Sequence, residues 1–529
     1  MSVITEQFPF PSQRMPAMAR NMVSTSQPLA VQAGLQAMRD GGNAVDAAIA
    51  TAITLTVVEP TMNGIGGDAF CILWDGNRLH GLNASGKSPA AVKASDFAGL
   101  TEMPHLGWDT VTVPGAVSAW VALSEKFGKL PFERLFEAAL HYADEGFMVP
   151  PVSARLWSQA PEAYKDYKDF GVFLPGGKAP RVGELFRLPE QARTLEKIAQ
   201  SKGESFYRGE LAERFVAASQ EAGAKFTMED LNSHSADWVE LISQQYHGYE
   251  LHEIPPNGQG LAALIMLGIL EYTDISKFAM DSADALHCQL EAMKLAFADL
   301  HRYVSDPDYL DVDIRELLEP EYLEARASLI DMTSAGNPGH GKTKDSGTVN
   351  LTTADASGMM VSYIQSNYDS FGSGIVIPGT GIALHNRGTD FSLQEGHPNQ
   401  IGGGKRPFHT IIPAFLTQDG KPLMSFGVMG GDMQAQGHAQ MVLRVCDYGM
   451  NPQAASDAPR WRVEKGNLVN MEKGFDEGVI AELKRRGHDI ADYNDEQIFS
   501  MGGAQLIKKT EAGYIGGSDH RKDGIAAGF

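Results

Sequence analysis

The pattern of apolar and polar positions predicts a chain that begins with helices. Apolar residues recur at helical spacing over 29–39, and a pair of glycines follows, so we predict a helix there. Asn43 is suited to cap a second helix over 44–58, which is apolar on nearly every side and should be buried. A glycine-rich turn and an apolar run over 69–74 then predict a strand.

The middle of the chain and its last third have different textures. Helical patterns dominate the middle, where we predict helices over 116–128, 132–146, 188–200, 208–222, 259–272 and 283–303. The segment 331–347 is small, polar and rich in glycine, which predicts an exposed, mobile connection. Strands are predicted beyond it, over 348–354, 359–365, 411–417 and 424–428.

Composition and charge argue against some classes of partner for this protein. The 529 residues are 43% hydrophobic and include 44 basic against 66 acidic side chains, a formal net charge of −22, which repels phosphate backbones and anionic membranes. We therefore expect no nucleic-acid partner and no membrane partner. The three cysteines indicate no disulfide framework, and no apolar leader stands in the first thirty residues, so a cytoplasmic protein is expected.

Two segments match the phosphate-loop pattern G-x4-G-K-[ST], namely Gly81–Ser88 and Gly336–Thr343. Such a loop needs a preceding strand and a helix that opens at the lysine, and neither segment has both. A nucleotide-binding protein that uses Gly81–Ser88 remains the alternative from another class. The fifteen histidines have no ligand spacing, so we expect most to be surface or capping residues. We also expect no metal and no organic cofactor.

Thr348 is the strongest candidate for chemistry. It follows Gly347 at the junction between the polar segment and a predicted strand. A threonine hydroxyl needs an adjacent base, and its own α-amino group, with a pKa near 8, supplies one once the preceding bond is cleaved. By base rate alone, however, a threonine that merely begins a strand is the more common case.

A resemblance to a known protein family favours the interpretation of Thr348 as a nucleophile. Long runs at 41–70, 291–308, 348–392 and the C-terminal Arg521–Gly524 resemble the γ-glutamyltranspeptidase family of N-terminal-nucleophile hydrolases. This resemblance implies an α/β fold of four layers, αββα, with two sheets between helices. It also implies self-cleavage between Gly347 and Thr348 into a large piece, 1–347, and a small piece, 348–529. The two pieces would form a heterodimer, with a higher homo-oligomer left open.

The resemblance also assigns catalytic roles. Thr348 matches the nucleophile, and Ser366 matches a residue that supports it by hydrogen bonding. Gly430 and Gly431 match the glycine pair whose backbone N–H groups form the oxyanion hole. Glycines suit that role because two amides can approach the oxyanion closely. A plain tight turn is the alternative for the glycine pair.

The substrate positions depart from the glutathione-cleaving pattern. The matching residues, which we predict to bind substrate, are Ser85, Tyr368, Arg387, Asp390, His409 and Thr410. Ser85 stands where those relatives have an arginine that clamps a carboxylate, and this removes a strong, geometry-specific contact. Asp390 keeps the family's acid, which would hold a substrate amine. Arg387 and His409 would bring a cation and a potential cation, although an ordinary ion pair is the alternative for Arg387.

This altered pattern resembles the branch with oxamate amidohydrolase and cephalosporin-acylase-like proteins. We therefore predict an autoprocessing amidohydrolase that hydrolyses a small carboxylated amide such as oxamate. The alternatives within the family are a γ-glutamyl (glutathione) hydrolase or transpeptidase and a glutaryl or cephalosporin acylase.

Overall fold

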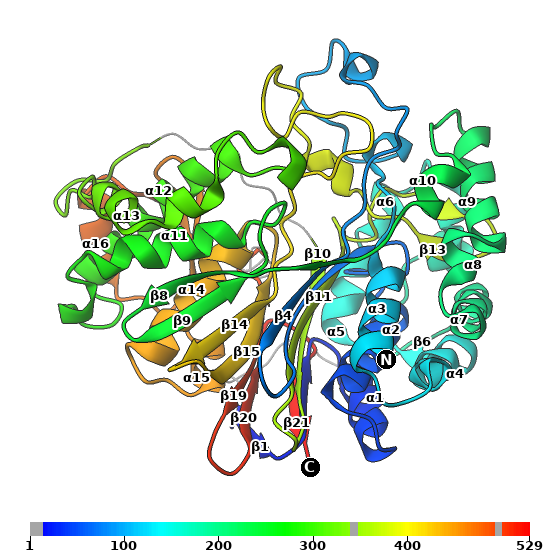
Figure 1. The fold of residues 1–529 in the computed structure, drawn as a ribbon, viewed down its shortest axis with the longest axis horizontal. Coiled ribbons are helices and arrows are strands. Elements are labelled where there is room, and N and C mark those ends of the chain that lie inside the picture. Colours follow the sequence, from blue (N-terminus) through cyan, green and yellow to red (C-terminus); the bar gives the residue numbers. More distant parts are fainter. Residues whose placement is uncertain (1–13, 339–346, 492–499) are drawn as a thin grey trace.

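Two central sheets pack face to face in the computed structural model, and helices cover both outer faces (Figure 1). The structure describes residues 14–338, 347–491 and 500–529. Strand β10 packs on β15 and β19 of the facing sheet, and β11 also packs on β15, so the interface between the sheets lies at their centres. The predicted four-layer αββα fold is confirmed.

Each central sheet has seven strands in the described part of the chain. The first runs in the order β1 (Ala17–Ala19), β20 (Tyr514–Ser518), β19 (Gly503–Lys509), β15 (Lys421–Met429), β14 (Ala414–Gln418), β9 (Tyr249–Glu253) and β8 (Ile242–Tyr246). The second runs in the order β21 (Ile525–Gly528), β2 (Met22–Thr25), β10 (Gly347–Ala354), β11 (Met360–Tyr368), β3 (Asp68–Trp74), β4 (Leu79–Asn83) and β7 (Asp237–Val239). All pairings within both sheets are antiparallel.

Helices form the two outer layers. On the side of the second sheet lie α1 (Pro28–Arg39), α2 (Ala44–Val58), α3 (Ala116–Phe127), α4 (Glu137–Glu145), α5 (Pro151–Trp157), α6 (Ala160–Ala163), α7 (Pro189–Ser201), α8 (Glu204–Tyr207), α9 (Glu210–Glu221) and α10 (Met228–Asn232). On the side of the first lie α11 (Gly260–Glu271), α12 (Ala283–Tyr303), α13 (Pro320–Ala327), α14 (Met433–Cys446), α15 (Pro452–Asp457) and α16 (Glu477–Arg485). Small ladders are formed by β5 (Phe147–Met148) with β6 (Leu185–Phe186), by β12 (Val376–Ile377) with β13 (Ile382–Ala383), and by β16 (Trp461–Lys465), β17 (Leu468–Met471) and β18 (Asp489–Ala491).

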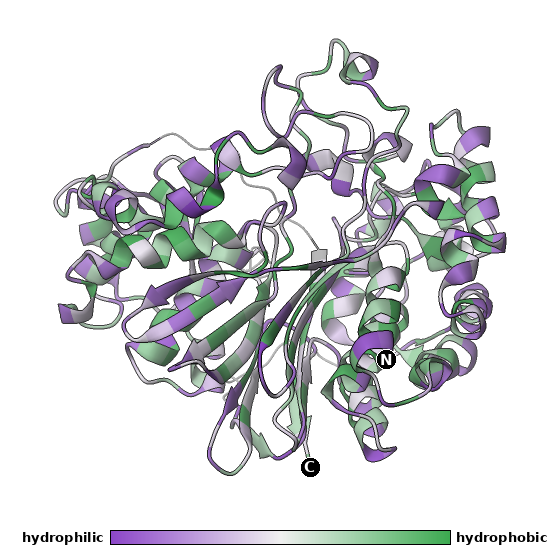
Figure 2. Cartoon of the chain, in the orientation of Figure 1, coloured by the Kyte–Doolittle hydropathy of each residue, from purple (hydrophilic) through white to green (hydrophobic). Residues whose placement is uncertain are grey.

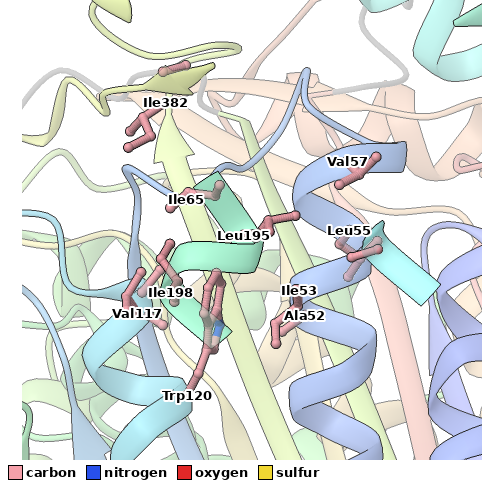
Figure 3. Close-up of a cluster of buried hydrophobic side chains, with 14 of the residues drawn as sticks. Ala52, Ile53, Leu55, Val57, Ile65, Val117, Trp120, Leu195, Ile198 and Ile382 are labelled. Atoms are coloured by element: carbon pink, nitrogen blue, oxygen red, sulfur yellow. The ribbon is translucent and has the colours of Figure 1, made fainter. Parts of the chain in front are cut away.

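Helix α2 shows how the sequence pattern produces the core. The Asn43 side chain accepts from the N–H groups of Val45 and Asp46, and the Asp46 carboxylate accepts from Asn43 N–H. This capping box fixes the first turn and confirms the predicted N-cap role of Asn43. Every residue of α2 is buried, and Ile53, Leu55 and Val57 lie in one cluster with side chains of α3 and α7 (Figure 3). Hydrophobic residues likewise run along α11, whereas hydrophilic ones mark the outer helices (Figure 2).

Most predicted elements are present, with shifts at their ends. The helix predicted over 132–146 is divided, because residues 132–136 form a 3-10 turn before α4 begins at Glu137. Tight turns of this kind are common where a helix begins. The strand predicted over 359–365 continues to Tyr368. In the described part of the chain, no helix is both long and apolar enough to cross a bilayer.

In the second sheet, strands β10 and β11, which follow residue 346, lie between β2 and β3, which precede it. β10 pairs with β2 on one side and with β11 on the other, and β11 pairs with β3. The C-terminal run Arg521–Gly524, one of the segments that carry the family resemblance, also joins distant parts of the chain. The Asp523 carboxylate accepts from the N–H groups of Val152 and Ser153, which begin α5.

Candidate active site at the start of strand β10

Thr348 lies where the ladder between β10 and β11 is irregular. Gly347 pairs with Tyr368 and Val349 with Gln365, so the register shifts at Thr348. Such bulges turn a side chain out of the regular alternation. The Thr348 side chain is fully buried, and its Oγ1 donates a hydrogen bond to Ser366 Oγ at 3.1 Å. The two residues that the resemblance paired therefore meet, and their catalytic roles stay predictions.

Ser366 is itself held in place by the backbone. Its Oγ accepts the N–H of Tyr368 at 2.7 Å as well as the hydroxyl of Thr348. Tyr368 has a φ of 73°, a left-handed conformation that is uncommon for a bulky residue and that persists only under tertiary restraint. The end of β11 thus presents a hydroxyl that accepts from, and so polarises, the Thr348 hydroxyl.

Gly430 and Gly431 follow directly after β15, the strand that faces β10 across the sheet interface. Their φ values are 130° and 59°, which favour glycine. A Cβ on Gly430 would lie 2.9 Å from the Cα of Gly502. The Gly431 carbonyl accepts from Gln259 Nε2 at 2.8 Å, and within the described ranges no acceptor takes the N–H of either glycine. Two adjacent amides therefore remain available for an oxyanion.

Arg387 is fully buried, in a short 3-10 segment over 387–390. Its Nη1 donates to Thr410 Oγ1 at 2.7 Å and to Asp390 Oδ2 at 3.1 Å. Its guanidinium lies over the Tyr368 ring, 4.2 Å from the centroid. Nε and Nη2, the two donors along one edge of the fork, have no partner among the described residues. Asp390 also accepts from the hydroxyl of Tyr368 at 2.7 Å, so both its oxygens serve the protein.

His409 differs from its expected role as a potential cation. Burial lowers its pKa to about 3, and the neighbouring Arg387 charge works in the same direction. Both ring nitrogens are engaged, because Nδ1 accepts the N–H of Ile411 at 3.3 Å and Nε2 faces Asp68 Oδ2 at 3.1 Å. The imidazole is thus neutral, and Arg387 is the cation of this group.

Ser85 lies in a buried network of amides. Its hydroxyl donates to Asn83 Oδ1 at 2.7 Å and lies within 3.3 Å of the Asn257 side chain. Its carbonyl accepts from Arg406 Nε at 2.9 Å. Ser85 therefore brings no charge to the position of the relatives' arginine. It joins the loop after β4 to the segment that carries His409.

Three residues of this site were missed from the sequence: Asp68, Gln259 and His385. Burial acts to raise the pKa of Asp68, but the neighbouring imidazoles and Arg387 outweigh it and hold that pKa below its usual range. Burial lowers the pKa of His385. Among the histidines, which we expected to be mostly surface or capping residues, six are buried in the described part of the chain, at 234, 287, 385, 409, 438 and 488.

The nucleotide-binding alternative gains no support. After β4, residues 84–93 form a loop, and a 3-10 turn over 94–97 stands where a phosphate loop needs a helix. A Cβ on Gly86 would lie 1.7 Å from the Val113 carbonyl oxygen, so that loop is closed against its neighbour. Most of the second match, Gly336–Thr343, falls outside the described residues.

Two other features lie away from Thr348. His287, Glu291 and His488 bring potential ligand atoms within 4.8 Å of one another, but the Lys294 ammonium ion-pairs with Glu291 at 2.5 Å and would repel a cation. A cavity of about 560 Å³ opens at the far ends of β3 and β4, and none of the predicted site residues lines it.

Comparison with known proteins gives the relationship directly. A family model described as gamma-glutamyltranspeptidase matches residues 30–529. The chain belongs to the gamma-glutamyltranspeptidase family. This family member is similar to the oxamate amidohydrolase proenzyme of Klebsiella pneumoniae subsp. pneumoniae, with 37% identity over 95% of this chain and 97% of that protein. It is 36% identical to the glutathione hydrolase-like YwrD proenzyme of Bacillus subtilis, over 96% and 98% of the two chains.

A solved structure gives the same answer for the fold. Cephalosporin acylase from Bacillus halodurans is 46% identical and superposes with a TM-score of 0.95, over 100% of this chain and 99% of that one. This gamma-glutamyltranspeptidase family member is accordingly an N-terminal-nucleophile amidohydrolase. The named activities of these relatives differ from one another, so the substrate has to be argued from the residues of the site.

Proposed function

We propose that this enzyme cleaves itself between Gly347 and Thr348 and then hydrolyses the amide bond of a small carboxylated substrate such as oxamate. Cleavage frees the Thr348 α-amine, whose pKa near 8 suits it to take the hydroxyl proton at neutral pH. The hydroxyl attacks the amide carbonyl, and the N–H groups of Gly430 and Gly431 stabilise the oxyanion. The α-ammonium group returns the proton to the leaving nitrogen, ammonia departs, and water hydrolyses the acyl-enzyme.

One observation carries the choice of substrate. The Nε–Nη2 edge of buried Arg387 has no partner among the described residues, although unpaired buried donors are costly. That edge matches the two oxygens of a carboxylate. Tyr368 stacks against one face, and Thr410 and Asp390 fix the opposite side at Nη1. A substrate carboxylate would complete this arrangement.

The same contacts disfavour a γ-glutamyl substrate. Such a substrate carries an amine as well as a carboxylate, and Asp390, the expected acceptor for the amine, already accepts from Tyr368 and Arg387. Ser85 supplies no second cation. A glutaryl-type acyl group remains a second candidate, because the chain is 46% identical to a cephalosporin acylase over its full length.

Comparing kcat/KM for oxamate, glutathione and a glutaryl amide under one set of conditions tests the proposal. We expect oxamate to be hydrolysed with the highest kcat/KM. A higher kcat/KM for the glutaryl amide would favour the acylase activity, and a higher value for glutathione would reject the argument against a γ-glutamyl substrate. Equilibrium titration with ATP and Mg²⁺ tests the nucleotide alternative, and we expect no binding.

A further inference from the structure

A buried carboxylate, Asp68, lies beside this site and takes no part in the steps above. It is the first residue of β3 and pairs across the sheet with Ser366. Its side chain is fully buried. Oδ1 accepts the N–H of Gly115 at 3.0 Å, and Oδ2 lies 3.1 Å from His409 Nε2. Both oxygens therefore face groups in fixed directions.

The surrounding hydrogen bonds determine which ring nitrogens carry protons. His409 Nδ1 accepts the backbone N–H of Ile411, so in the neutral ring Nε2 carries the proton and donates it to Asp68. His385 Nε2 lies 2.9 Å from the Thr112 carbonyl and must donate to it. Its Nδ1, 3.5 Å from Asp68 Oδ2, is then a bare acceptor in the neutral ring. Of the two rings, only His409 donates a hydrogen bond to Asp68, so Asp68 fixes the orientation of His409.

His409 connects this carboxylate to the open edge of Arg387. The next residue in the chain is Thr410, whose hydroxyl accepts from Arg387 Nη1 at 2.7 Å. Arg387 has only one other protein acceptor in the described ranges, Asp390, and that bond is on the same nitrogen. A shift of the segment with His409 and Thr410 would therefore rotate the guanidinium about Asp390 and redirect its Nε–Nη2 edge.

We propose that Asp68 is a positioning residue for substrate recognition, which acts through His409 and Thr410 to aim the open edge of Arg387 at the substrate carboxylate. This inference rests on the proposed function. An amide cannot replace the carboxylate, because the side chain of an Asp68→Asn variant would turn an N–H toward either His409 or Gly115, and both already donate. The consequence is specific to substrates that carry a carboxylate.

The test uses oxamate and its uncharged isostere oxamide with the processed enzyme and its Asp68→Asn variant. We expect the variant to lose at least about tenfold of its preference for oxamate through a higher KM, with kcat nearly unchanged and self-cleavage intact. Asp299→Asn is the matched control. Asp299 is a buried acid in α12 that pairs with Arg326 at 3.0 Å, away from this site. It should change stability and leave the preference as in wild type.

A second variant keeps the test decisive if Asp68→Asn does not fold. His409→Phe keeps an aromatic ring against Phe70, 4.8 Å away between centroids, and removes the bond to Asp68. It should raise the KM for oxamate as Asp68→Asn does, and the double variant should be no worse than either single change. In proton NMR, the hydrogen-bonded His409 Nε2–H signal should shift or vanish in Asp68→Asn, because at most a neutral amide oxygen replaces the carboxylate, and it should keep its wild-type position in Asp299→Asn.

The outcomes separate the two claims. Wild type without a preference for oxamate over oxamide would reject the proposed function and this inference with it. A wild-type preference that survives in both Asp68→Asn and His409→Phe would overturn the inference alone. Equal losses on oxamate and oxamide would also overturn it, since they would indicate general damage to the site.

Discussion

Two regions of the candidate site meet at Tyr368 and differ in the kinds of chemical group that they contain. We call the first the reaction region, which comprises Thr348, Ser366, Gly430 and Gly431. We call the second the charge region, which comprises Asp68, His385, Arg387, Asp390 and His409. The reaction region contains only hydroxyls and backbone amides, whereas the charge region holds two fully buried formal charges, Asp68 and Arg387, and a third, Asp390, whose side chain is 6% exposed. The contrast suggests that chemistry and substrate choice reside in separable side chains.

The largest effect is expected from Thr348→Ala in the reaction region. Without the hydroxyl there is no nucleophile for self-cleavage or for turnover. The variant should remain one chain and be inactive, while wild type should give two pieces, with Thr348 at the start of the smaller one. Gel electrophoresis and N-terminal sequencing check this. An uncut wild-type chain with full amidase activity would contradict the mechanism.

Gly430→Val comes next. A branched Cβ at a φ of 130° and within 2.9 Å of the Gly502 Cα must displace the amide pair. Loss of one oxyanion donor lowers kcat by roughly 10²–10³. We expect a fall at least that large, equal for oxamate and oxamide, with the circular dichroism of the fold retained. Near-normal turnover would mean that these glycines only form a turn.

Arg387→Lys probes the charge region and should act on KM instead. Lysine keeps the charge but loses the planar fork, so oxamate should bind roughly tenfold more weakly while oxamide is little affected. Arg387→Gln should weaken oxamate further, and it should not create glutathione cleavage, since Ser85 supplies no clamp. If Arg387→Gln left the steady-state kinetics of oxamate unchanged, the two regions would not divide the work as argued.

The smallest effect concerns acid stability. Because the folded pKa of His409 is lowered to about 3, the unfolded chain takes up a proton below about pH 6.5 that the folded chain refuses. Stability is lost as pH falls, by about 2–3 kcal/mol from this group between pH 7 and pH 4.5. His409→Phe should flatten the curve of urea midpoint against pH by that amount. Thr348→Ala should leave its slope unchanged.

Elements and contacts that depend on residues close together in the sequence could be predicted. The site residues that were missed are brought together by contacts between distant parts of the chain. Asn43 and the apolar run after it specify α2 within a few residues. Thr348 and Ser366 lie on strands joined by one turn, so their meeting followed from a hairpin. Asp68 and His385 are more than 300 positions apart and share a site because a bridge between Gly66 and Leu384 joins the segments just before them. No local pattern signals that neighbourhood, although Asp68 at the end of a glycine-rich turn was a usable hint.

If the chain cleaves itself as proposed, the interleaving of strands around β10 also constrains how the two fragments can behave afterwards. Once the bond before Thr348 breaks, β10 still lies between β2 of one fragment and β11 of its own, and β21 still borders β2. Neither fragment can leave without tearing central ladders of the same sheet. Two differently mutated precursors processed in one tube should therefore not exchange fragments, and a defect in one half could not be rescued by supplying that half later. Under the proposed self-cleavage, maturation would be irreversible, and the two fragments of one precursor would stay together.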